Sequence, residues 1–137
     1  MENSQTLISA LLDAWNAHDT ERLKTFFDPQ YEGVDVANPG LQRGVTEAQQ
    51  RIETYLRAFP DLNFTLDDTV LQGAQVVLMW TAHGTHRGVF MHIPPTGRRV
   101  VVRGISVLTM KDDKILRGYY MWDVAGLLRA IGLLPEL

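Results

Sequence analysis

Asp123 is the first residue of this sequence whose type and setting indicate chemistry. It follows the aromatic run GYYMW and precedes VAGLLRAIG, which has the pattern of a final helix. One interpretation is a helix N-cap, because aspartate readily accepts hydrogen bonds from the first amides of a helix. The other is a carboxyl group at the mouth of an apolar cavity. Burial there would raise its pKa toward the range in which a general acid or base works at neutral pH.

Three further polar residues stand among apolar or turn-forming neighbours. His86, in TAHGTHRG, shares a strand face with Trp80 if side chains alternate by twos, and has either a structural hydrogen-bonding role or a role in a site. Asp35 precedes the turn sequence ANPG, so it is either an Asx-type turn residue or a second pocket carboxylate. Arg103 lies inside VVVRGISVL, where an unpaired buried charge is costly. Arg103 could pair with a carboxylate in the pocket, either Asp35 or Asp123. Alternatively, it could lie on an outer face and form an ion pair there.

Other kinds of chemistry are not indicated. The sequence has no cysteine, which removes thiolate chemistry, disulfides and cysteine metal sites. It has no GxSxG, P-loop or GxGxxG motif. His83 and His86 are three residues apart, which in a strand directs them to opposite faces, so we expect no metal site. Without a cofactor motif, we expect no cofactor, and any reaction must depend on acid/base groups in a shaped cavity.

The composition is that of one ordinary globular domain over residues 1–137. Hydrophobic residues make up 45% of the chain, charged residues 21%, and the net charge is -3. The sequence has no stripe of Lys or Arg of the kind that binds nucleic acid. No apolar run approaches the roughly 18 residues that span a bilayer. MENSQTLISALL lacks the basic start of a signal peptide. Together with the absence of cysteine, this leads us to expect a cytoplasmic protein.

The elements that must position these residues are helices first and strands afterwards. Apolar spacing predicts a helix in SQTLISALLDAWNAHD, a short one capped by Asp19, and a third from Thr46, where Thr46 and Gln49 form a capping-box pattern. A short strand is expected at YEGVDV, and VAGLLRAIGLL reads as the final helix. Four long strands are predicted at 63–72, 75–86, 98–110 and 114–122. This order indicates the α+β class, with an antiparallel sheet curved over the helices.

Two of the predicted strands are apolar on both faces. VVLMWTA, at 76–82, and VVVRGISVL, at 100–108, do not alternate with polar residues as a sheet with one wet face would. We therefore expect helices on one face and a second copy of the chain on the other. This predicts a homo-oligomer, a dimer or a tetramer, formed through the outer face of the sheet.

Aromatic side chains supply flat apolar surface on which a planar substrate could stack, although most such residues simply belong to a core. The connection GTHRGVFMHIPPTGRRV, at 84–100, is also unusually apolar for a loop between strands. The aromatic residues in question are Trp15, Tyr31, Tyr55, Trp80, Tyr119 and Trp122.

The second half of the sequence resembles a known family. GTHRGVFMHIPPTGRRVVVRGISVL, followed by DDKILRGYYMWDVAGLLRAIGLL, is similar to the SnoaL-like polyketide cyclases, or ester cyclases, of the nuclear transport factor 2-like superfamily. LLDAWNAHDTERLKTFFDPQY and YLRAFPDLNFTLDD fit the same pattern, so the resemblance runs from about Leu7 to Leu134.

The resemblance implies a cone-shaped fold, in which a curved antiparallel or mixed sheet wraps around three N-terminal helices. A short C-terminal helix and a deep hydrophobic cavity complete it. The 87–97 connection would then lie over the cavity rim, unless it contacts a neighbouring subunit. The pocket wall would include Phe90, Met91, Ile93 and Pro94.

The resemblance also implies a function. It makes Asp123, in the W-D motif, the acid/base residue, and gives His86 a pocket or hydrogen-bonding role. The family often reads YVDHD where this sequence has YEGVD, so Val34 replaces a histidine and puts the standard reaction in question. We predict an enzyme for cofactor-independent intramolecular aldol ring closure of an aromatic polyketide, an anthraquinone-type methyl ester, by aspartate acid/base catalysis.

Two alternatives remain. The cavity could serve another reaction on a hydrophobic small molecule, as an isomerase, dehydratase, epoxide hydrolase or partner in hydroxylation. It could also bind such a molecule without catalysis, in which case Asp123 is only a cap.

Overall fold

In the computed structural model, which describes residues 2–136, the chain opens with two helices, α1 (Glu2–Asn16) and α2 (Thr20–Lys24). His18 ends the first of them with a φ of 55°, a left-handed conformation that a helix does not accommodate. Asp19 then caps α2, because its side chain accepts a hydrogen bond from the amide of Arg22 at 3.1 Å. The predicted Asp19 cap is confirmed.

The third helix, α3 (Gly44–Ala58), starts two residues before the predicted position. Its N-cap is Arg43, which makes no side-chain cap, and the predicted Thr46–Gln49 capping box is wrong. Glu47 takes the reciprocal role instead, accepting a hydrogen bond from the backbone amide of Arg43 at 2.7 Å. Gly44 allows the earlier start, since its φ of 77° turns the chain directly from the preceding strand into the helix.

One six-stranded sheet carries the rest of the fold, and its strand order is β2-β1-β6-β5-β4-β3. The pair β1 and β6 is parallel and the other pairs are antiparallel, so the sheet is mixed, as the α+β prediction allowed. The expected short strand at YEGVDV is part of a longer one and is followed by a second, unpredicted strand. The strands are β1 (Phe27–Asp35), β2 (Asn38–Arg43), β3 (Asn63–Gln72), β4 (Gln75–Thr85), β5 (Arg99–Lys111) and β6 (Lys114–Trp122).

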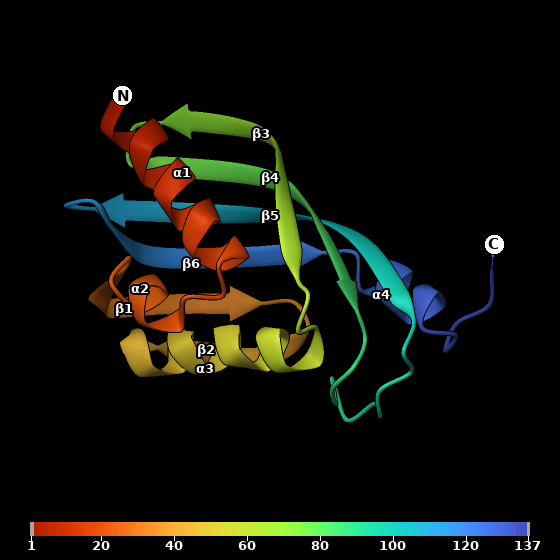
Figure 1. The fold of residues 1–137 in the computed structure, drawn as a ribbon. Helices are drawn as coiled ribbons and strands as arrows, with labels where there is room; N and C mark the ends of the chain where they lie inside the picture. The colour runs from red at the N-terminus through yellow and green to blue at the C-terminus, as the bar shows by residue number, and fades with distance from the viewer. Residues whose placement is uncertain (1, 137) are drawn as a thin grey trace.

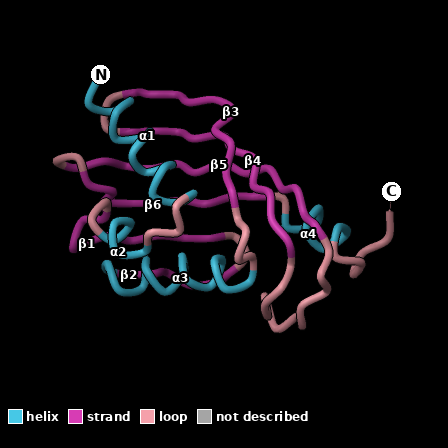
Figure 2. Tube along the Cα trace, in the orientation of Figure 1, coloured by secondary structure: helices cyan, strands magenta, loops and turns pink. Residues whose placement is uncertain are grey.

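The helices cover one face of this sheet, which is called the inner face below. In Figure 1, α1 crosses the strands at the β3 side, while α2 and α3 lie at the β1 and β2 side. The tube in Figure 2 shows β4 and β5 bending toward the side of the short helix α4 (Val124–Ala130), while β3 bends toward the end of α3. Within residues 2–136, no helix combines the length and apolar content that crossing a bilayer requires.

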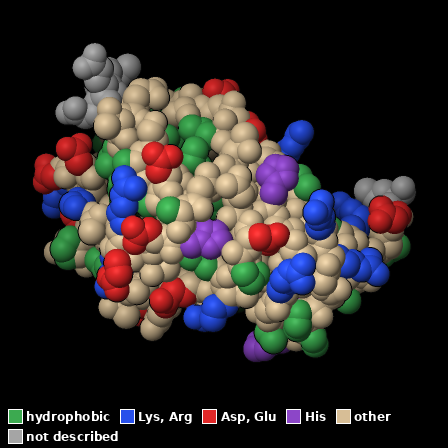
Figure 3. All heavy atoms as spheres, in the orientation of Figure 1, with side chains coloured by type: hydrophobic (Ala, Val, Ile, Leu, Met, Phe, Trp, Pro, Cys, Tyr) green, Lys and Arg blue, Asp and Glu red, His purple; other side chains and the backbone are tan. Residues whose placement is uncertain are grey.

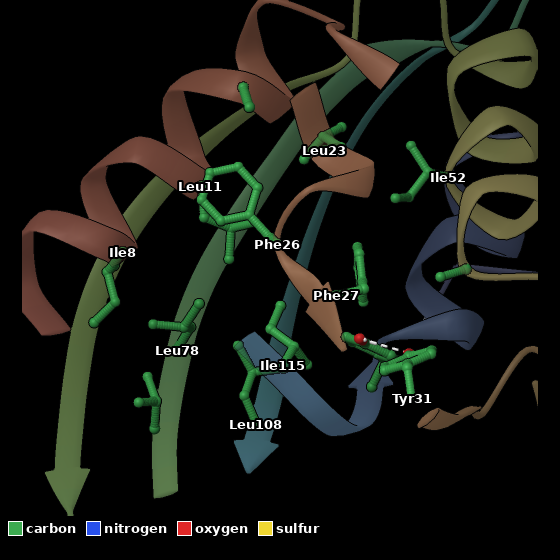
Figure 4. Close-up of a cluster of buried hydrophobic side chains, with 14 residues drawn as sticks. Ile8, Leu11, Leu23, Phe26, Phe27, Tyr31, Ile52, Leu78, Leu108 and Ile115 are labelled. Carbon is green, nitrogen blue, oxygen red and sulfur yellow. Dashed lines mark hydrogen bonds between the residues drawn. The ribbon is translucent and has the colours of Figure 1, made fainter. Parts of the chain in front are cut away.

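Two clusters of buried side chains fill the space between the helices and the sheet. Figure 4 shows the first, in which Ile8 and Leu11 of α1 point toward Leu78 and Leu108 of the sheet. The second lies nearer α4 and includes Leu127. Trp15, Leu56 and Trp80 pack against both clusters, so the interior is continuous.

Glycines on the inner face allow aromatic rings to lie flat on the sheet. A Cβ atom on Gly33 would stand 2.0 Å from the hydroxyl oxygen of Tyr31, and one on Gly118 would stand 2.2 Å from that of Tyr120. Real Cβ atoms do not approach other atoms so closely, so each tyrosine occupies space that only a glycine two residues away leaves open. The two hydroxyl oxygens meet at 2.8 Å.

Two rows of apolar side chains cross the outer face of the sheet. In register order, one row of side chains runs through Val70, Val77, Val107, Tyr119 and Val34. A second row contains Met79, Ile105 and Met121. The helix-covered side in Figure 3 is different, because acidic and basic side chains are scattered across it.

Candidate functional site

A cavity lies between the helices and the inner face of the sheet. It encloses about 1100 Å³ of empty space, counting the part that opens to solvent. Most of its lining is aliphatic or aromatic, from α1, α3, β3 to β6 and α4. The exceptions are Arg51, Tyr55, Ser106 and Tyr120, together with the indole nitrogens of Trp15, Trp80 and Trp122. Such a chamber suits a hydrophobic ligand held by few polar contacts.

Asp35 is the centre of a polar cluster at one end of this cavity. Its side chain is fully buried at the end of β1, and its Oδ2 accepts hydrogen bonds from Arg51 Nε at 2.9 Å and the Tyr55 hydroxyl at 2.5 Å. Its Oδ1 accepts from Trp122 Nε1 at 3.1 Å and the Ala37 amide at 2.9 Å. The last bond is the predicted turn contact, so Asp35 is both a turn residue and part of the site. It does not itself line the cavity.

The cluster keeps Asp35 ionised and Tyr55 protonated. Burial alone would raise the pKa of Asp35, but the charge of Arg51 and the hydrogen bonds from Tyr55 and Ala37 lower it below its ordinary value. Burial raises the pKa of Tyr55, and the neighbouring Asp35 charge raises it further against the opposite effect of Arg51. The phenol therefore remains a donor to the carboxylate.

Arg51 presents unused donors to the cavity. Burial would lower its pKa, but Tyr120, Tyr55 and Asp35 together raise it, so the guanidinium stays charged. The guanidinium carbon of Arg51, Cζ, lies 3.6 Å from the centroid of the Tyr120 ring. This contact holds the guanidinium in place. Only its Nε forms a hydrogen bond with another residue within the described chain, so the two terminal amino groups form none there.

A second polar point lies on the sheet itself. Trp80 Nε1 donates a hydrogen bond to the Ser106 hydroxyl oxygen at 3.0 Å, and both residues line the cavity. The indole of Trp80 lies over Gly104, where a Cβ atom would come within 2.2 Å of its ring. Gly104 thus allows Trp80 to lie along the floor of the chamber.

Asp123 is not where the catalytic interpretation requires it. Its side chain is exposed, and Oδ1 accepts a hydrogen bond from the amide of Gly126 at 2.8 Å, which makes Asp123 the N-cap of α4. It does not line the cavity, whereas the preceding residue, Trp122, does. Alternation at the end of β6 turns Trp122 inward, so the carboxylate that follows it projects outward. The structure therefore supports the cap and gives no geometric support to an acid/base role.

His86 and Arg103 also lie outside the cavity. His86 is fully buried, and its Nδ1 accepts a hydrogen bond from the backbone amide of Thr96, so it fastens the 86–98 connection. This matches the structural interpretation. Arg103 is exposed on the outer face, and no ion pair forms on it within the described residues. Of its proposed partners, Asp35 pairs with Arg51 instead.

The 86–98 connection contributes one residue to the pocket wall. Phe90 is 4% exposed and lines the cavity, with its ring centroid 5.4 Å from that of Tyr55. The other predicted wall residues do not line it: Met91 and Pro94 are exposed, and Ile93 is half-buried and pairs with Phe90 through an isolated β-bridge. Met91 has a φ of 52°, and this turn carries its side chain outward.

Most of the predicted aromatic residues line the cavity, but two do not. Tyr31 lies beneath it, hydrogen-bonded to Tyr120, and Tyr119 is on the outer face with 46% of its surface exposed. The predicted residues that line it are Trp15, Tyr55, Trp80, Phe90 and Trp122.

Sequence reasoning missed Arg51, Ser106 and Tyr120. The signals were present, since Arg51 stands four residues before Tyr55 on the same helical face. Tyr120 and Ser106 follow from the two-residue period of their strands, counted from Trp122 and Gly104.

Comparison with known proteins adds a family. The sequence model of the SnoaL-like polyketide cyclases matches residues 5–131. No curated protein sequence shows significant similarity to the chain.

Several solved structures share the fold over almost the whole chain. TsrD from Streptomyces laurentii is 30% identical, with a TM-score of 0.87 and 97% of each chain covered. AclR from Streptomyces galilaeus, a proposed hydroxylase, is 26% identical with a TM-score of 0.87, covering 100% of this chain and 89% of its own. IdmH from Streptomyces antibioticus, a proposed polyketide cyclase, is 25% identical with a TM-score of 0.80, covering 96% of this chain and 99% of its own.

Proposed function

Because the chain belongs to the SnoaL-like polyketide cyclase family, we propose that it closes a ring in a hydrophobic, planar polyketide without a cofactor. The proposed reaction is the intramolecular aldol addition of an anthraquinone-type methyl ester with a side-chain carbonyl. Its site is the end of the cavity where Arg51, Tyr55 and Trp122 surround Asp35.

The observation that carries this proposal is the uneven distribution of polar groups in the cavity. Apolar side chains form most of the wall, while a guanidinium and a phenol that both reach the cavity share one buried carboxylate. A cationic donor in a dry chamber stabilises an oxygen that gains negative charge during a reaction. An enolate is such an oxygen, and its formation is the first step of an aldol addition.

In the proposed mechanism, Tyr55 transfers the proton. A carbon flanked by two carbonyl groups gives its proton to the Tyr55 oxygen as the phenolic proton moves to Asp35 Oδ2. Arg51 stabilises the resulting enolate oxygen through its terminal amino groups. The enolate carbon then bonds to the side-chain carbonyl carbon, and the new alkoxide takes the proton back from Asp35 through Tyr55.

The pKa directions fit this relay. Because the pKa of Tyr55 is raised, a free phenolate does not accumulate, and the two proton movements occur together. Because the pKa of Asp35 is lowered, the protonated carboxyl group readily gives its proton back. Much of the acceleration is expected to come from the apolar walls, which hold the two reacting carbons in contact.

The test is the rate of ring closure for such an ester, followed by chromatography and mass spectrometry of the product. Replacing Tyr55 with Phe is expected to lower the rate by about 10²–10⁴-fold, the usual contribution of a positioned acid/base group. Asp123→Asn is the matched control and should keep the rate. Ring closure by Tyr55→Phe at the wild-type rate would disprove the relay. Binding of the ester without any reaction would favour the non-catalytic alternative.

A role in hydroxylation is a second candidate, favoured by the similarity to AclR over the full chain. The same assay separates the two functions. Ring closure leaves the mass of the substrate unchanged, whereas hydroxylation adds one oxygen atom and consumes an oxidant that the assay must supply.

We also propose that the outer face of the sheet binds a second copy of the chain. One of its apolar rows crosses five strands and the other crosses three, and at about 4.8 Å per strand the longer row is about 20 Å wide, the scale of a stable protein interface. The charges are complementary within one face: Arg103 lies in register with Thr81, and Thr81 donates a hydrogen bond to Asp67. In a two-fold contact through this face, the same residues of both copies would take part.

A further inference from the structure

We propose that Ser106, held by Trp80, is a specificity-determining residue that donates a hydrogen bond to a ring carbonyl oxygen of the substrate. This inference deepens the proposed function, and it rests on the cavity being the substrate site. Nothing in the family assignment or the acid/base cluster calls for a hydroxyl group at this position.

The hydrogen bond from Trp80 orients the hydroxyl group of Ser106. Its oxygen accepts the indole N–H of Trp80 at 3.0 Å, so one lone pair is already used and the hydroxyl hydrogen is turned away from the indole. Within residues 2–136 the Ser106 hydroxyl forms no hydrogen bond other than the one it accepts from Trp80. Ser106 is 9% exposed, and the space it faces is the cavity.

A buried donor without a partner is unfavourable in an apolar chamber. Alanine differs from serine only by the hydroxyl group, so it would remove the unsatisfied donor with little change in shape. The serine and the tryptophan N–H that orients it are therefore better explained by a ligand acceptor than by packing.

The indole of Trp80 forms a flat surface beside the hydroxyl. Trp80 lies over Gly104, and any side chain at position 104 would collide with the indole or with the Cβ atom of Trp122, which is 2.8 Å from the Gly104 Cβ position. Phe64 meets the indole edge to face at a centroid distance of 5.3 Å and fixes its tilt. A planar ring lying along this floor would bring an edge oxygen to Ser106.

Ser106 lies close to the polar cluster that contains Arg51. Ser106 and Tyr120 are direct partners across β5 and β6, which places their side chains about 5 Å apart. Arg51 lies over the Tyr120 ring. One ring system can therefore reach both donors, with a neutral carbonyl at Ser106 and a negatively charged oxygen at Arg51. A quinone that also carries an acidic or enolisable oxygen has this chemistry.

The experiment measures binding of two probes that differ only in their ring carbonyls, anthraquinone-2-carboxylate and anthracene-2-carboxylate. Their carboxylate can engage Arg51 in both cases, but only the quinone offers an acceptor to Ser106. Affinities are measured by quenching of tryptophan fluorescence and confirmed by calorimetry, with the full-length chain.

We expect the wild-type protein to prefer the quinone by about fivefold, the effect of one neutral hydrogen bond. Ser106→Ala should remove the preference, and Ser106→Thr, which keeps the hydroxyl, should retain it. Thr109→Ala, on the same strand but outside the cavity lining, is the matched control and should change neither affinity.

Trp80→Phe tests the same contact from its other side. Without the indole N–H the serine hydroxyl can rotate, so the preference should fall even though a flat ring remains. This variant keeps the test valid if Ser106→Ala does not fold.

Three results would overturn the inference: no preference in the wild type, equal loss of both affinities in Ser106→Ala, or no binding of either probe. Ring-closure assays run in parallel separate it from the proposed function. A clear quinone preference without turnover rejects the cyclase and keeps the inference, while turnover without the preference does the reverse.

Discussion

The two faces of strands β4, β5 and β6 differ in how they use residue size. On the inner face, Gly104 and Gly118 stand beside Trp80 and Tyr120, and each ring lies over the glycine. On the outer face, the same strands carry large side chains, such as Ile105, Tyr119 and Met121, with no small residue between them. Rings on the inner face thus occupy space that the glycines leave open, whereas the large outer-face side chains have no glycine between them.

The two faces also differ in how they treat charge. On the inner side, Asp35 and Arg51 neutralise each other and are held by surrounding donors. On the outer side, Arg103 stands exposed among apolar residues. The charges of the inner pair thus compensate each other within one chain, whereas Arg103 forms no ion pair within the described residues.

Asp35→Asn should have the largest effect on stability. It leaves the charge of Arg51 buried without its partner, and breaking a buried pair in this way costs about 3 kcal/mol or more. For a chain of this size that corresponds to a decrease in Tm of about 10 °C. Thermal unfolding followed by circular dichroism measures it. A Tm equal to the wild type would show that the pair does not stabilise the fold.

Ile105→Glu should break the proposed assembly and leave the cavity intact. In a two-fold interface each copy contributes one new charge to an apolar contact, so the dimer should weaken by about 100-fold, and quinone affinity should stay unchanged. Light scattering coupled to size-exclusion chromatography measures the oligomer. A wild-type protein that is monomeric at micromolar concentration would contradict the proposal before any variant is made.

Gly104→Ala should damage the inner face alone. The added methyl group would collide with the Trp80 ring, and relieving such a clash costs about 1–3 kcal/mol. Because the indole must move off the sheet, Trp80 should lose its bond to Ser106, and binding of the quinone probe should weaken. Thermal unfolding and the binding assay measure the two effects. An unchanged affinity would mean that the tilt of Trp80 does not matter for the ligand.

Acid should destabilise the protein partly through Asp35. The pKa of Asp35 is lower in the folded state than its ordinary value of 3.8, so the unfolded chain takes up a proton first as the pH falls. The stabilisation is present above about pH 4 and is lost as the pH falls through the folded pKa. Asp61, whose pKa the hydrogen bond from Thr85 lowers, acts in the same direction. Urea titrations from pH 6 to pH 3 should therefore show a smaller loss for Asp35→Asn than for the wild type.

Asp123→Asn should have almost no effect. Asparagine caps helices about as well as aspartate, so stability should change by less than about 0.5 kcal/mol. The ring-closure rate should also stay at the wild-type value, because the side chain lies outside the cavity. A large loss of rate with an unchanged Tm would restore Asp123 as the acid/base residue and refute the site proposed here.

The fold was largely predictable because its periodic signals are local. The long strands and the Asp19 cap follow from spacing within a few residues. The start of α3 was wrong because Gly44 makes an entry into the helix that a capping pattern does not anticipate. The extent of β1 was also missed, since its pairing with β6 joins segments about 85 residues apart.

The site was only partly predictable, because it depends on direction and on distant partners. The W-D motif identifies the right turn, but the residue that faces the cavity is Trp122, not Asp123. Arg51 in a helix of mixed composition is typical of a solvent-exposed residue, and only the fold brings Asp35 beneath it. A sequence motif identifies residue types, but the alternation of side chains along a strand determines which of them faces the cavity.

Phe90 belongs to a connection that is attached to α3 by backbone bonds from Arg87 and Gly88 to the Ala58 carbonyl oxygen. Such bonds do not depend on side-chain identity, so insertions or deletions beyond them would move this one ring without disturbing the sheet. The volume of the cavity can therefore change during evolution through changes in this one loop. For protein engineers, that makes residues 89–95 the natural place to enlarge or narrow the range of accepted molecules.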